Sequence, residues 1–147
     1  MEMTEVKAMF CLNCNARLTE WLTVIDTAEA AAALCDFRKP GANKEKAIEP
    51  VSFGHVLEMS YEVQSELDVT GTLGGRSAHK IWFNPKDFTG CVLWNAEIEW
   101  KIGCCDVDGY YGPNRECQCE RIVGTEFADC YQWHVFEAEQ KNTYWKT

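Results

Sequence analysis

Six of the nine cysteines lie in three short clusters, and their spacing is the feature of the chain with the clearest chemistry. In a C-x-x-C pair, one tight turn brings two thiolates to the same tetrahedral Zn²⁺, with Zn–S distances of about 2.3 Å. We therefore expect a structural zinc site formed by the early pair together with Cys117 and Cys119, or with one of Cys104 and Cys105 and one of Cys117 and Cys119. The three clusters are Cys11 with Cys14, Cys104 with Cys105, and Cys117 with Cys119.

The early pair ends at residue 14 and the later cysteines begin at residue 104, so the two halves of this site are far apart in the sequence. A metal that joins them would clip the N-terminal knuckle onto the C-terminal half and close a long loop. Six thiols are more than the four ligands of one tetrahedral ion, so either two of them do not bind metal or a second metal is bound. The alternatives are ordinary buried thiols or a redox pair, although a thioredoxin-like βαβ context is missing. The solitary Cys35, Cys91 and Cys130 are expected in the core.

The chain shows no sign of export or of a membrane span. Residues 1–11 carry two glutamates and no signal-type apolar segment. No apolar run approaches the roughly 18–20 residues that cross a bilayer. The number of cysteines, nine, is odd, whereas a protein in which all cysteines form disulfides has an even number. We expect a cytoplasmic protein with reduced thiols.

The net charge of the chain indicates which classes of binding partner to expect. Fourteen lysines and arginines oppose 23 aspartates and glutamates, which gives a net charge of −9. Such a surface repels nucleic-acid phosphates and anionic lipid, so neither is an expected partner. A basic protein partner is favoured, because opposite charge speeds encounter and rejects acidic competitors.

Signatures of catalysis are absent. The three histidines, His55, His79 and His134, occur in no H-E-x-x-H or H-x-E pattern, and no G-x-S-x-G elbow is present. We expect a protein that is not an enzyme. The alternative is a small metal-dependent enzyme in which His134 or a carboxylate replaces one cysteine ligand and leaves a water to activate.

The predicted architecture is one α+β domain, residues 1–147, with a largely antiparallel sheet of five or six strands and one or two helices. A helix is expected to begin at a capping box, Asp26–Glu29, and to end at Arg38–Gly41. Residues 18–25 fit a helix and a strand equally well. The loop 40–50 and the turns at 71–77 and 84–88 separate the strands, which are expected at 55–64, 79–83, 92–102, 121–125 and 131–137.

Residues 103–130, G-C-C-D-V-D-G-Y-Y-G-P-N-R-E-C-Q-C-E-R-I-V-G-T-E-F-A-D-C, resemble a motif of small bacterial cysteine-rich proteins for which no activity is known. The motif runs GCCGxDGxxGPN, CxCG and VGTExxDC, after an N-terminal CPxCG knuckle. Residues 81–90 are similar to the middle segment of that family. In this chain Asn15, Asp106 and Glu120 stand at glycine positions of the pattern. The resemblance implies a bacterial or phage origin and a shared cysteine site.

These features together predict a non-catalytic protein-binding module, most concretely an immunity-type inhibitor of a toxin or of another cytosolic protein. Acidic inhibitors steer basic partners electrostatically, and aromatic anchors then slow dissociation. The candidate contact residues are Glu58, Glu62, Glu97, Glu99, Tyr110, Tyr111, Tyr144 and Trp145.

Overall fold

The computed structural model describes residues 5–38, 48–69, 79–95, 109, 112–128 and 132–147. In this part of the chain there are nine strands and two α-helices, which agrees with an α+β fold but exceeds the five or six strands predicted. The elements are β1 (Val6–Cys11), β2 (Leu22–Ile25), α1 (Ala28–Leu34), β3 (His55–Glu58), α2 (Tyr61–Val69), β4 (Ile81–Phe83), β5 (Val92–Trp94), β6 (Arg115–Cys117), β7 (Ile122–Phe127), β8 (Val135–Ala138), the 3₁₀ helix η2 (Gln140–Asn142) and β9 (Thr143–Lys146).

The strands form a single sheet in the order β5-β6-β7-β8-β4-β3-β2-β1-β9. The β2–β3 pair is parallel and the other neighbours are antiparallel, as expected for a largely antiparallel sheet. Strands β1, β6 and β9 were not predicted. The polar C-terminal segment is ordered as β9 because it pairs with β1, with Cys11 opposite Thr143 and Met9 opposite Trp145.

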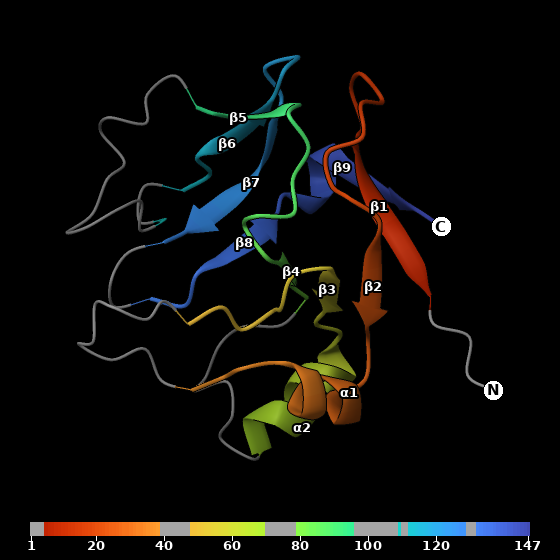
Figure 1. The fold of residues 1–147 in the computed structure, drawn as a ribbon, viewed down its shortest axis with the longest axis vertical. Coiled ribbons are helices and arrows are strands. Elements are labelled where there is room, and N and C mark those ends of the chain that lie inside the picture. Colours follow the sequence, from red (N-terminus) through yellow and green to blue (C-terminus); the bar gives the residue numbers. More distant parts are fainter. Residues whose placement is uncertain (1–4, 39–47, 70–78, 96–108, 110–111, 129–131) are drawn as a thin grey trace.

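The central strands bury both of their faces, because successive side chains of a strand point to opposite sides. In β3, Val56 lies in one apolar cluster and Leu57 in another; in β4, Phe83 and Trp82 divide in the same way. The first cluster draws residues from β1 at one end of the sheet and from β5 and β6 at the other. The sheet therefore curls until its two ends share one core (Figure 1).

Helices α1 and α2 lie side by side at one end of the molecule (Figure 1). They cover the second apolar cluster through Ala31 of α1 and through Val63 and Leu67 of α2. Among the described residues, no helix is long and apolar enough to cross a bilayer.

The predicted strand 55–64 is wrong in its second half. Strand β3 stops at Glu58, and α2 begins at Tyr61 after Ser60, whose Oγ accepts the amide hydrogen of Val63 at 3.2 Å. The four-residue spacing of Val63 and Leu67 is the helical signal, and Ser60 is a favoured N-cap. The alternation of apolar and polar residues over 55–64 does not distinguish a strand from a helix, because Met59 and Val63, four residues apart, share one face in either structure.

The predicted first helix is shorter than expected and shifted at its start. Thr27, not Asp26, is the N-cap, and its Oγ1 accepts the amide hydrogen of Ala30 at 3.1 Å. The helix ends at Leu34, before Arg38. The ambiguous segment 18–25 contains strand β2, and the turn at 84–88 is confirmed by a hydrogen bond from the Asp87 amide to the Asn84 carbonyl.

The predicted strand 92–102 is observed as β5 only over Val92–Trp94. Val92 is buried, whereas Leu93 and Trp94 are both exposed, so the Trp94 side chain lies at the surface and not in the core. The Trp94 ring is covered by the Arg115 guanidinium, whose carbon lies 3.4 Å from the ring centroid. Residues 96–102 of the predicted strand and the turn at 71–77 lie outside the described residues.

Candidate metal centre

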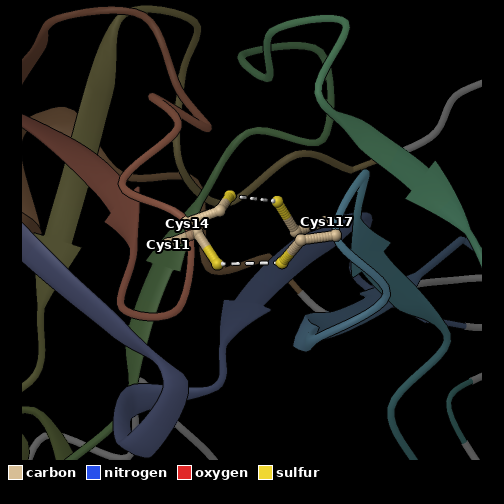
Figure 2. A group of neighbouring side chains, drawn as sticks. Cys11, Cys14 and Cys117 are labelled. Atoms are coloured by element: carbon tan, nitrogen blue, oxygen red, sulfur yellow. Dashed lines mark hydrogen bonds between the residues drawn. The ribbon is translucent and has the colours of Figure 1, made fainter.

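Four cysteine thiols from two distant segments meet at one point. Cys11 ends β1 and Cys14 follows it in a turn, while Cys117 ends β6 and Cys119 lies in the next turn. Their four sulfur atoms all lie within 4.8 Å of one another (Figure 2). The Sγ of Cys11 is 3.5 Å from that of Cys119, and the Sγ of Cys14 is 3.5 Å from that of Cys117.

These separations match a metal site rather than disulfides. A tetrahedron with Zn–S bonds of about 2.3 Å has sulfur–sulfur edges of about 3.8 Å. The observed separations, from 3.5 Å up to a limit of 4.8 Å, bracket that value. A disulfide would need about 2.05 Å. The four thiols could therefore hold a tetrahedral ion.

The backbone closes both knuckles in the same way, although one is C-x-x-C and the other C-x-C. In the first, the Cys11 amide donates to the Ala16 carbonyl at 3.0 Å and the Asn15 amide donates to the Cys11 carbonyl at 2.9 Å. In the second, the Cys117 amide donates to the Arg121 carbonyl at 2.8 Å, and the Glu120 amide donates to the Cys117 carbonyl at 2.7 Å. These backbone hydrogen bonds hold the two thiols of each turn in position.

The residue after the second cysteine of each knuckle has a left-handed backbone. Asn15 has φ 63° and Glu120 has φ 73°. Asn tolerates this region because its short side chain can bond locally, whereas Glu does so less readily. The Asn15 carboxamide oxygen also accepts a hydrogen bond from the Tyr144 hydroxyl at 2.9 Å.

Asn13 links the two knuckles through its side chain. Its Nδ2 donates to the Sγ of Cys119 at 3.3 Å, and its Oδ1 accepts from Nη2 of Arg121 at 3.3 Å. The hydrogen bond from Asn13, followed by that from the Arg121 backbone amide, lowers the pKa of Cys119 to about 6. This favours the thiolate that a metal needs.

Two buried thiols of the group, Cys11 and Cys117, show the opposite shift in pKa. Burial raises the pKa of Cys11 and of Cys117 above the ordinary value for a thiol. A bound cation would reverse this effect, because metal coordination deprotonates a thiol outright. The site therefore combines two buried thiols with Cys119, a half-buried thiol whose pKa is lowered.

The structure brings four of the six predicted ligand cysteines together and does not describe the other two. Cys104 and Cys105 lie outside the described residues, as does Cys130. Cys35 packs against the second apolar cluster and Cys91 against the first, as the core assignment predicted. His134 is not a member of the thiol group; its amide donates to the carbonyl of Ile48.

The predicted partner contacts are in several environments. Glu58 accepts a hydrogen bond from Nζ of Lys7 at 3.0 Å, whereas Glu62 is exposed in the first turn of α2. Tyr144 stacks on Phe10 with ring centroids 5.5 Å apart, and Trp145 packs against the first core cluster. The remaining candidates, Glu97, Glu99, Tyr110 and Tyr111, lie outside the described residues.

Comparison with protein-family models, curated proteins and solved structures finds no match to this chain. The resemblance of residues 103–130 to bacterial cysteine-rich proteins therefore stays a prediction.

Proposed function

We propose that Cys11, Cys14, Cys117 and Cys119 hold a structural zinc ion. The observation that carries this proposal is the four-sulfur group itself, with every sulfur within 4.8 Å of the others. Sets of four thiolates in tetrahedral arrangement are typical of zinc and of iron–sulfur centres. Zinc suits this set because four cysteines complete its coordination and leave no position for substrate.

The position of the site explains what the ion would stabilise. The sheet order places β1 and β6 far apart, separated by five other strands, yet the two knuckles touch. An ion between them would fasten the two ends of the curled sheet around the first core cluster. Because it also closes a loop of about a hundred residues, it constrains the unfolded chain strongly.

Elemental analysis tests the zinc proposal. Protein purified without added metal is expected to contain about one zinc per chain, and the double variant Cys14→Ser/Cys119→Ser is expected to contain almost none. Cys35→Ser is the matched control, because Cys35 is a free thiol outside the group. Iron in place of zinc, or equal zinc in all three proteins, would contradict the assignment.

We further propose that the zinc-stapled domain is a non-catalytic binding module of immunity type for a basic protein partner. The net charge of −9 supports electrostatic steering of such a partner. Four carboxylates also converge on a cavity of about 280 Å³ between α1 and α2, namely Asp26, Glu29, Glu62 and Glu66. A lysine or arginine of a partner would be attracted to this groove.

A capture experiment tests the binding proposal. Immobilised zinc-loaded protein is exposed to lysate of its own cell at low salt, and the double variant Glu62→Gln/Glu66→Gln is expected to retain less of any basic partner. Glu5→Gln/Glu20→Gln removes the same charge from exposed residues outside the groove and is expected to bind as the parent does. Equal capture by both variants would argue against the groove, and turnover of a small molecule would favour the enzyme alternative.

A further inference from the structure

A second cavity lies directly beside the cysteine group. Its charged lining residues are cationic, whereas those of the groove between α1 and α2 are acidic. This second cavity encloses about 210 Å³ and is lined by two cationic side chains, two carboxamide residues and one leucine. The five lining residues are Leu12, Asn13, Arg121, Lys141 and Asn142.

Three segments that are far apart in the sequence are joined here by hydrogen bonds. The Leu12 amide of the first knuckle donates to the Asn142 carbonyl of η2 at 3.0 Å. Asn142 Nδ2 donates to the Ile122 carbonyl at 2.9 Å, and Arg121 Nη2 donates to Asn13 Oδ1 at 3.3 Å. These contacts join the three segments that line the cavity and hold the Arg121 guanidinium beside Asn13.

The two cations of this cavity lack an acidic partner within the described part of the chain. The ion pairs found there use Lys7, Arg17, Arg38, Lys80, Lys86 and Arg115. Arg121 and Lys141 take part in none of these pairs, although carboxylates greatly outnumber cations in the chain. Two uncompensated positive charges that face one cavity create a local site for an anion.

We propose that this cavity binds a small molecule through an oxyanion group, either a phosphate or a carboxylate. A guanidinium can donate two parallel hydrogen bonds to such a group, and a lysine ammonium adds a mobile point charge. The volume is below the roughly 300 Å³ at which drug-sized pockets begin, so the ligand is small. Leu12, with 58% of its surface exposed, offers an apolar wall to a short hydrocarbon part of the ligand.

A competing role for the same cations is to offset the negative charge of four thiolates. Asn13 makes this role concrete, because its side chain touches both Cys119 and Arg121. The two roles differ in what the loss of the cations changes. An anion site loses its ligand and keeps its metal, whereas a counter-charge role weakens metal binding and involves no ligand.

Titration calorimetry of the zinc-loaded protein tests the proposal, with inorganic phosphate in one arm and succinate in the other. We expect saturable binding of at least one anion with a stoichiometry of one. Lys141→Gln is expected to weaken it about tenfold, and Arg121→Gln/Lys141→Gln to abolish it within the measurable range. Lys86→Gln removes the same charge from a residue that lines no part of the cavity and is expected to bind normally.

Zinc content and thermal unfolding are measured on the same four proteins. Tighter binding of phosphate assigns a phosphorylated ligand, and tighter binding of succinate assigns a carboxylate. Absence of saturable binding in both arms overturns the proposal, as does binding that survives in the double variant. Loss of zinc from Arg121→Gln/Lys141→Gln without any anion binding by the parent assigns the cations to the metal centre instead.

Discussion

Asn15 and Glu120 occupy equivalent positions in the two knuckles, each directly after a second cysteine and each with a left-handed backbone. The amide of each donates to the carbonyl of the first cysteine in its own turn. The equivalence holds although the second knuckle is one residue shorter than the first. The left-handed residue, more than the number of residues between the cysteines, therefore defines the turn that presents each pair of thiols.

Replacement of Glu120 by glycine is expected to stabilise the protein. A left-handed conformation costs an L-residue about 1 kcal/mol, which glycine avoids, although its freer unfolded chain offsets part of the gain. We expect the free energy of unfolding of the zinc-loaded protein to rise by roughly 0.5 kcal/mol in urea titrations at fixed zinc concentration.

Glu139→Gly is the matched control for that change. Glu139 directly precedes η2, and its φ of −83° is ordinary for any residue. Glycine there is expected to lower the free energy of unfolding by about 0.5–1 kcal/mol. Equal losses in the two variants would show that the left-handed turn imposes no strain on Glu120.

The sequence identified the thiols of the candidate site better than it identified the fold. Cysteine spacing is a local property, so C-x-x-C and C-x-C could be recognised without any knowledge of the sheet. The choice of Cys117 and Cys119 as partners of the early pair depends on the curl of the sheet, which no short segment encodes. The supporting contacts of Asn13 and Arg121 were missed for the same reason, although both residues lie within two positions of a cysteine.

Errors in the predicted elements arose where tertiary pairing overrides local pattern. Strand β9 is short and polar, and it exists because β1 offers it a hydrogen-bonding edge. The three residues of β6 are too few to show alternation, and they are ordered by β5 and β7 on either side. Two local signals could have separated α2 from β3: Ser60, because a serine N-cap marks a helix start, and the four-residue spacing of Val63 and Leu67.

Arg115 is expected to tolerate no conservative replacement. Its guanidinium carbon lies 3.4 Å from the Trp94 ring centroid and 4.6 Å from that of Phe88, and both Nε and Nη2 donate to Glu126. Lysine keeps the charge but loses the flat stacking surface and the two-pronged hydrogen bond. Arg115→Lys should lower the free energy of unfolding by about 1–2 kcal/mol.

Arg17→Lys provides the comparison for Arg115. Arg17 also lies near a ring, but 6.0 Å from the Trp21 centroid, and its ion pair with Glu20 is exposed and 3.9 Å long. The same substitution there is expected to change stability by less than about 0.5 kcal/mol. Denaturant titration measures both variants, and equal effects would refute the stacked arrangement.

Asp87 should make stability depend on pH. Its carboxylate is buried, Oδ2 accepts the Gly54 amide at 2.8 Å, and Oδ1 has no partner among the described residues. Burial raises the pKa of Asp87, and nearby Glu20 and Glu49 add to this effect. The stabilising contribution of Asp87 to the free energy of unfolding is thus fully present below the unfolded-state pKa of about 3.9. It is lost as the pH rises through the raised folded-state pKa.

Asp87→Asn tests this assignment. The uncharged side chain keeps an oxygen for the Gly54 amide and avoids the cost of a buried charge. We expect the variant to be more stable than the parent at pH 7, with an advantage that shrinks as the pH falls. The measurement is the difference in unfolding free energy between the two proteins at each pH, so that zinc loss in acid affects both alike. A constant difference, or a less stable variant at pH 7, would contradict the raised pKa.

Gly124 is required by close packing between β7 and β8. A Cβ built there would lie 2.2 Å from Cε1 of Phe136 and 2.7 Å from the Glu137 carbonyl oxygen, and real Cβ atoms do not approach so closely. Phe136 is fully buried and cannot move aside without disturbing its contacts with Phe83 and Phe88. Gly124→Ala should therefore lower the free energy of unfolding by about 2–3 kcal/mol.

Gly90→Ala is the control for Gly124→Ala, because a Cβ at residue 90 would meet nothing within 4 Å. We expect it to change the free energy of unfolding by less than about 0.5 kcal/mol. Thermal unfolding of the two zinc-loaded variants decides the matter: if both unfold at the temperature of the parent, Phe136 does not lie where the structure places it.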